Sequence, residues 1–107
     1  MVKEVHAAGG HIMAQLWHLG ANANPDFLPG SIKPVSPSGL RKPGEKVGEP
    51  MTQSDIDAAI EAYAQGAHAA QLAGFHGIEL HGAHGYLIDQ FFWSGTNLRT
   101  DQYGGDI

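Results

Sequence analysis

Two short, mostly apolar runs dominate the hydrophobic pattern of the chain, one at residues 11–17 and one at residues 77–81. The first is nearly continuous and has uncharged ends, and both predict strands that are buried on both faces, as in parallel sheets. Ahead of the first run, apolar side chains at three-residue spacing in residues 2–8 end at Gly9-Gly10. This pattern predicts the last turns of a helix whose beginning lies outside the sequence.

One amphipathic segment lies between the two runs and predicts a helix over residues 52–73. Thr52 is placed to cap its first amides, and Asp55 favours the positive end of the helix dipole. Gly74 suits a left-handed cap at its end. The apolar stripe, at spacings of three and four, consists of Ile56, Ala59, Ile60, Tyr63, Ala67 and Ala70. Strand, crossover helix and strand together predict a parallel βαβ unit.

The segment between the first strand and the helix, residues 18–51, contains all six prolines and shows no helical or strand period. It predicts a long loop, and a loop of that length in a compact domain usually carries function. An apolar, aromatic segment at residues 86–93 follows the second strand. Because two strands cannot form a sheet that hides both faces, the chain is expected either to oligomerise or to be a piece of a larger α/β protein.

Composition narrows the class of protein. With 107 residues, 15 Gly and 6 Pro, the chain is neither a helix bundle nor collagen, and 42% hydrophobic residues argue against disorder. The net charge of −5 disfavours nucleic acids and anionic membranes as partners. The absence of cysteine excludes disulfides and thiol catalysis. No run is long enough to span a bilayer or to form a signal core, so a cytoplasmic protein is expected.

Polar and aromatic side chains collect where the two predicted strands end, which in parallel α/β folds is where functional groups gather. They are Gln15, Trp17 and His18 after the first strand, and His81, His84 and Tyr86 after the second. Paired imidazole N–H groups suit a carbonyl or nitro oxygen that gains negative charge, and a phenol nearby can deliver a proton. Packing roles for His81 and Tyr86, with His84 on the surface, explain the spacing equally well.

The other candidates also have two interpretations. The Gln15 carboxamide suits a heterocycle with alternating donors and acceptors, or a buried hydrogen bond to backbone. Trp17 suits either a pocket wall or the core. Seven histidines raise the hypothesis of a metal-binding domain, but the spacing of His81 and His84 is not that of structural zinc, and no cysteine completes a set. No metal site is therefore expected, and His68 is expected to be exposed.

These residues, taken together, resemble the old yellow enzyme family, the NADH:flavin oxidoreductases or ene-reductases. The matching motifs are GGHIMAQLWH at residues 9–18, PVSPS at 34–38, AGF at 73–75, ELHGAHGYLIDQF at 79–91 and NLRTDQYGG at 97–105. The resemblance implies a (β/α)8 barrel that carries FMN at its carboxyl-end face. Residues 1–107 would be a partial FMN-binding barrel domain, with about the third and fourth strands, the long loop and the helix between them.

The resemblance also implies a role for each candidate. Gln15 would bind the pyrimidine edge of the flavin, and Trp17 would shape the pocket above the ring. His81 and His84 would hold the oxygen of an activated alkene, with His81 also near the flavin, and Tyr86 would donate a proton. In the implied reaction NAD(P)H reduces FMN, and the flavin then passes hydride to an α,β-unsaturated carbonyl or nitro compound. The physiological alkene and the preference between NADH and NADPH are not implied.

The sequence departs from the family pattern at one position and covers only part of the barrel. Ala21 stands where the family usually has an arginine, and Arg99 is expected to hold its own loop through Asp101 or Asp106. Because the later flavin-facing arginine and the phosphate-binding loops lie outside the sequence, the chain alone is expected to bind FMN weakly or not at all. The alternative is a non-catalytic half-barrel module that binds a ligand, itself or a complementary barrel fragment.

Overall fold

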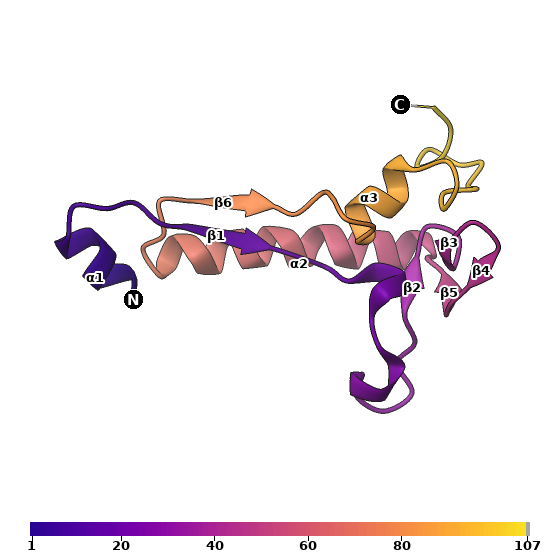
Figure 1. Cartoon of the computed structure of the whole chain (residues 1–107), viewed down its shortest axis with the longest axis horizontal. Coiled ribbons are helices and arrows are strands. Elements are labelled where there is room, and N and C mark those ends of the chain that lie inside the picture. The colour runs from indigo at the N-terminus through magenta and orange to yellow at the C-terminus, as the bar shows by residue number, and fades with distance from the viewer. Residues whose placement is uncertain (107) are drawn as a thin grey trace. The chain divides into compact units, whose positions relative to one another are not determined.

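The computed structural model describes residues 1–106 (Figure 1). They form two compact units. Unit 1 comprises Met1–Trp17 and Ser54–His81. Unit 2 comprises His18–Gln53 together with the residues from Gly82 onward. Each unit is therefore built from two stretches of chain that are distant in the sequence.

Unit 1 contains a parallel pair of strands and a long helix. β1 (Met13–Leu16) and β6 (Gly77–Leu80) pair in parallel along their whole length, first residue opposite first and last opposite last. The 20-residue helix α2 (Gln53–Leu72) precedes β6, and Figure 1 shows both strands running along it. The predicted strands, crossover helix and parallel pairing are confirmed, with the helix one residue shorter at each end than predicted.

Two glycines end the helices of unit 1 in the same way. After α1 (Val2–Ala7), Gly9 has a φ of 76°, and the amides of Gly9 and Gly10 donate to carbonyls of the last turn at 2.9 Å each. After α2, Gly74 has a φ of 86°, and the amides of Gly74 and Phe75 do the same at 3.0 and 3.1 Å. Both ends are Schellman caps, which confirms the predicted glycine stops.

The two faces of the β1/β6 sheet have different surroundings. Alternate strand positions point to opposite sides. The side that carries Leu16 faces α2, where a Cβ added to Gly66 would come within 3.3 Å of the Leu16 side chain. On the opposite side Met13 is 54% exposed. The prediction of strands buried on both faces is therefore wrong for this chain, because one helix over two strands covers only one face.

Unit 2 contains very short elements where the sequence predicted a loop without structure. They are the 3-10 turns η1 (Gly20–Asn22) and η2 (Pro25–Phe27), the strands β2 (Val35–Ser36), β3 (Leu40–Lys42), β4 (Glu45–Lys46) and β5 (Glu49–Pro50), and the helix α3 (Leu87–Phe92). β2 pairs in parallel with β5, and β3 pairs with β4 as an antiparallel hairpin. The loop prediction is wrong here, because strands of two or three residues are too short to show a period.

Within residues 1–106, the interior of unit 2 contains four buried polar residues beside the apolar Ala21, Ala23, Met51 and Leu87. Ser36, Gln90 and Thr96 are at most 1% exposed, and Asn97 is 9% exposed. The Thr96 hydroxyl donates to the Gln90 carbonyl at 2.9 Å, and the Asn97 side-chain amide donates to the carbonyls of Phe91 and Tyr103 at 2.8 and 2.7 Å. Since buried polar groups need partners, these bonds fix the backbone that follows α3.

Candidate active site

The uncovered face of the β1/β6 sheet carries three of the predicted site residues. In a parallel pair, residues opposite each other share a face, and every second residue returns to it. Gln15 lies opposite Glu79 in the register, and Trp17 and His81 follow each of them by two positions. Gln15, Trp17, Glu79 and His81 therefore point to the side of the sheet away from α2.

Trp17 and His81 lie side by side at the carboxyl end of this face. Their ring centroids are 6.3 Å apart, with the planes tilted by 59°. The amide of His81 donates to the Leu16 carbonyl at 3.0 Å, which extends the ladder of the two strands by one residue. Trp17 is 53% exposed, so it is not a core residue of unit 1. The parallel pairing thus places an aromatic wall and an imidazole next to each other.

Gln15 is exposed on the same face, so within this chain it is not a buried backbone partner. Its carboxamide offers one acceptor and two donor hydrogens. The edge of a flavin pyrimidine ring alternates acceptors and donors, so this donor set fits the edge of FMN. The assignment of Gln15 and His81 to the cofactor stays a prediction.

Sequence reasoning gave no role to Glu79, although it shares this face. The carboxylate is exposed and lies opposite Gln15 in the strand register. The signal was present in the sequence, because Glu79 precedes His81 by two positions within a predicted strand and so must point to the same side.

His84 and Tyr86 belong to unit 2, where they flank Gly85 in a tight turn before α3. His84 has a φ of 60° and is the only non-glycine residue with positive φ among residues 1–106. Gly85 follows with a φ of 75°, and Tyr86 is the N-cap residue of α3. His84 is exposed and Tyr86 is half-buried. That the imidazoles of His81 and His84 face one space stays a prediction.

His18 has a structural role in unit 2. Its Nδ1 accepts a hydrogen bond from the Gly20 amide at 3.0 Å, and its carbonyl accepts one from the Leu87 amide at 3.1 Å. Burial lowers the pKa of His18, which favours the neutral ring that this acceptor role requires. His18 therefore joins η1 to the start of α3.

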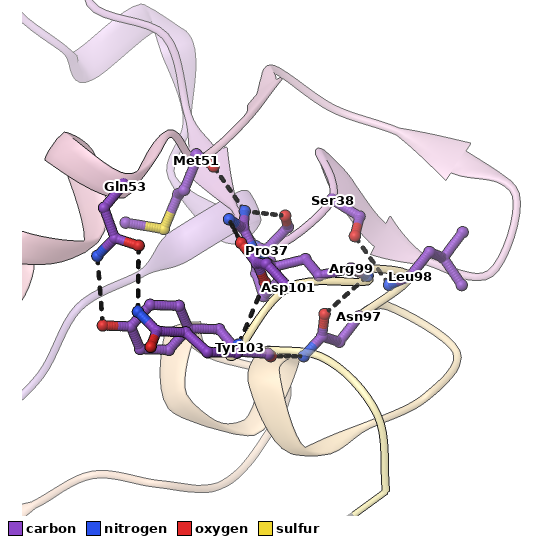
Figure 2. Close-up of polar contacts among 10 residues, drawn as sticks. Pro37, Ser38, Met51, Gln53, Asn97, Leu98, Arg99, Asp101 and Tyr103 are labelled. Carbon is purple, nitrogen blue, oxygen red and sulfur yellow. Dashed lines mark hydrogen bonds and ion pairs between the residues drawn. The ribbon is translucent and has the colours of Figure 1, made fainter.

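Arg99 is bound on all sides by its own unit, as Figure 2 shows. Its Nη1 donates to the carbonyls of Pro37 and Met51 at 3.1 and 2.6 Å. Its Nε donates to Asp101 at 2.9 Å, and Nη2 pairs with the same carboxylate. The hydrogen bond from Arg99 lowers the pKa of Asp101. The predicted loop-holding role of Arg99 is confirmed, with Asp101 as the partner.

Ala21, where the family pattern usually has arginine, is fully buried in η1. Its amide donates to Gln90 Oε1 at 3.1 Å, and its carbonyl accepts from Arg41 Nε at 3.4 Å. The guanidinium group of Arg41, which also pairs with Glu45 at 3.2 Å, thus reaches the backbone at this position.

Two further findings concern metal binding and membrane-spanning helices. Within residues 1–106, no three His, Asp or Glu side chains are grouped so that they could hold a metal ion. His68 is exposed on α2, as predicted. No helix in the described part of the chain is long and apolar enough to cross a membrane.

Comparison with known proteins identifies the family. The sequence profile of the NADH:flavin oxidoreductase / NADH oxidase family matches residues 1–107. Flavin oxidoreductase hxnT from Emericella nidulans is 41% identical over 112 residues, covering 96% of this chain and 29% of that protein. The chain therefore spans less than a third of the length of this relative.

Solved structures give the same result. Morphinone reductase in complex with tetrahydroNAD matches with a TM-score of 0.90 and 36% identity, over 98% of this chain and 33% of its own. An old yellow enzyme homologue from Zymomonas mobilis matches with a TM-score of 0.86 and 37% identity, over 97% of this chain and 32% of its own. Both are (β/α)8 barrels, so the predicted fold class is confirmed. The chain belongs to the NADH:flavin oxidoreductase / NADH oxidase family, the old yellow enzymes, and forms part of that family's barrel.

Proposed function

We propose that this chain supplies the third and fourth strands of an FMN-dependent oxidoreductase that reduces activated C=C bonds with NAD(P)H. The substrates in this proposal are α,β-unsaturated carbonyl or nitro compounds. The observation that carries the proposal is the uncovered face of the β1/β6 sheet, where Trp17 and His81 lie 6.3 Å apart beyond an exposed Gln15. Because the chain covers about a third of its structural relatives, the activity is that of the complete protein.

Gln15 holds and orients the cofactor in this proposal. Its carboxamide pairs with the pyrimidine edge of the isoalloxazine, and its place in β1 fixes the direction of that pairing, because strand ladders are rigid. When bound, FMN supplies a hydride to the substrate. Trp17, beside His81, forms a wall of the substrate pocket and excludes water from it.

His81 and His84 bind the oxygen of the substrate. Each donates an N–H to the carbonyl or nitro oxygen, and these hydrogen bonds strengthen as that oxygen gains negative charge. Only such a gain between ground state and transition state accelerates the reaction. Tyr86 delivers a proton from its hydroxyl to the α-carbon, which becomes tetrahedral in the saturated product.

The variant Tyr86→Phe tests this assignment in the complete protein. We expect alkene reduction to slow by about 10²-fold to 10⁴-fold, because the proton donor is lost. Reduction of the flavin by NAD(P)H needs no proton from Tyr86 and should proceed at the wild-type rate. Stopped-flow absorbance of the flavin measures the two half-reactions separately, with 2-cyclohexenone as the alkene.

Tyr103→Phe is the matched control, because the Tyr103 hydroxyl accepts from Gln53 at 3.3 Å and has no role in the reaction. It should leave both half-reactions unchanged. Equal loss of both half-reactions in Tyr86→Phe would show that the phenol is not the proton donor.

A further inference from the structure

Both backbone polar groups of Gly85 are bound by side chains. The Gly85 amide donates to Asp89 Oδ2 at 2.7 Å. The Gly85 carbonyl accepts from Asn22 Nδ2 at 2.8 Å and from Gln90 Nε2 at 2.6 Å. Three side chains from two elements of unit 2, η1 and α3, thus meet on one residue that has no side chain of its own.

These bonds fix the two peptide planes that surround Gly85. The amide of Gly85 lies in the plane shared with His84, and its carbonyl lies in the plane shared with Tyr86. The next planes outward are held as well, because the Tyr86 amide donates to the Ala83 carbonyl at 3.3 Å and the Gln90 amide donates to the Tyr86 carbonyl at 2.8 Å. With the planes on both sides of His84 and of Tyr86 held, the directions of their Cα–Cβ bonds are held too. The left-handed φ of 60° at His84 makes this support necessary, because a histidine adopts such a φ at a cost.

Gln90 is the centre of the network. It is 1% exposed, and its Oε1 accepts from the Ala21 amide at 3.1 Å while its Nε2 donates to Gly85. Gly20 lets it come this close, since a Cβ at Gly20 would collide with the Gln90 carboxamide. The carboxamide supplies one acceptor and one donor at fixed positions, and an apolar side chain of the same size has neither.

We propose that Asn22, Asp89 and Gln90 are positioning residues for the reduction of the alkene, because they hold the His84–Gly85–Tyr86 turn in the geometry that the substrate requires. The inference rests on the proposed function of His84 and Tyr86. None of the three side chains needs to touch the substrate, and each acts through the backbone of Gly85. A displacement of a reacting group by about 1 Å costs on the order of 100-fold in rate.

The variant Gln90→Glu tests the inference through a new pH dependence. A protonated glutamic acid can still donate to the Gly85 carbonyl, whereas a carboxylate repels it. A buried carboxyl keeps its proton to higher pH than an exposed one. The rate of 2-cyclohexenone reduction should therefore approach the wild-type rate at low pH and fall on the order of 10-fold to 100-fold as the pH rises. Flavin reduction by NAD(P)H should show no such change.

Several titratable groups surround the network. They are Asp89 on the Gly85 amide, Arg41 on the Ala21 carbonyl, His18 on the amide of Gly20 beside the Gln90 carboxamide, and His84 and Tyr86 on either side of Gly85. The pH profile of alkene reduction by the wild-type protein, measured in the same experiment, shows how much these groups contribute. Gln71→Glu, an exposed position on α2, is the matched control for added charge and should keep the wild-type profile. A purely structural role of Gln90 would lower both half-reactions together, and this result would overturn the inference.

Asn22→Ala gives a second test that does not depend on a buried charge. It removes one of the two donors to the Gly85 carbonyl and leaves Gln90 in place. Alkene reduction should therefore slow about 10-fold, whereas the rate of flavin reduction by NAD(P)H should not change. Wild-type rates in both Asn22→Ala and Gln90→Glu would overturn the inference. Tyr86→Phe in the same assay separates this inference from the proposed function. If Tyr86→Phe slows only alkene reduction, the proposed function stands even when the inference about Asn22, Asp89 and Gln90 fails. If Tyr86→Phe does not slow alkene reduction selectively, the proposed function itself fails.

Discussion

Single polar side chains with several partners determine the local geometry of unit 2. Arg99 is the clearest case: its side chain is 13% exposed and joins the carbonyls of Pro37 and Met51 to Asp101 (Figure 2). Pro37 and Met51 belong to the long proline-rich segment, and Asp101 lies beyond α3. One guanidinium group therefore connects parts of the chain that are far apart in sequence, a geometry that a lysine cannot reproduce.

Arg99→Ala should lower the free energy of unfolding by about 2 to 3 kcal/mol, because it leaves two carbonyls and a carboxylate without their charged donor. Urea unfolding of the complete protein measures this change. Lys33→Ala is the control: Lys33 pairs with Glu49 at 3.0 Å with both side chains more than half accessible, and a surface pair contributes under about 1 kcal/mol. Equal effects of the two substitutions would contradict the role of Arg99.

At the scale of elements, the amino-terminal end of unit 1 carries a cluster of three histidine rings. The His76 ring centroid lies 4.5 Å from that of His6 on α1 and 4.2 Å from that of His11 before β1. His76 Nδ1 also accepts from the Ile12 amide at 3.2 Å, and the His76 amide donates to the Ile12 carbonyl at 2.9 Å. The cluster therefore connects α1 and both strands.

This cluster predicts a loss of stability in mild acid. Desolvation, and then the nearby charges of His11 and His6, lower the pKa of His76. The unfolded chain therefore binds more protons than the folded one below the ordinary histidine pKa of about 6.5, and stability falls as the pH drops through that region. The midpoint of thermal unfolding, measured from about pH 8 to about pH 5, should decrease accordingly.

His76→Asn removes the titrating ring and keeps an acceptor for the Ile12 amide. The variant should show a smaller decrease of the unfolding midpoint over the same pH range than the wild type. His68→Asn, at an exposed position on α2, should keep the wild-type decrease. The same pH dependence in all three proteins would exclude His76 as the source.

At the scale of the whole molecule, the sequence predicted the βαβ unit well because its signals are local. Gly9 and Gly74 end helices at positive φ, and the apolar runs coincide with β1 and β6. The Gly85 network escaped prediction because its bonds join residues far apart in sequence, such as Ala21 and Gln90. The short strands escaped for the same reason: Val35 pairs with Glu49, and neither lies in a periodic run.

Part of the candidate site could also be predicted from the sequence. Gln15 and Trp17 share a face because strand alternation requires it, and this follows from the sequence. The register that brings His81 to the same face comes from the structure. The positive φ of His84 could not, since histidine rarely adopts that conformation and only its neighbours impose it. The resemblance in the motifs supplied the roles of these residues, which periodicity alone does not give.

The central claim is that this chain is the flavin-edge part of an FMN barrel and needs the rest of the barrel to hold the cofactor. Titration of FMN, followed by flavin absorbance and size-exclusion mass, tests it on the complete protein and on the 107-residue chain side by side. We expect one tightly bound FMN in the complete protein and little or none in the chain alone. A complete protein that takes up no FMN, or a stoichiometric flavin complex of the chain alone, would contradict the account.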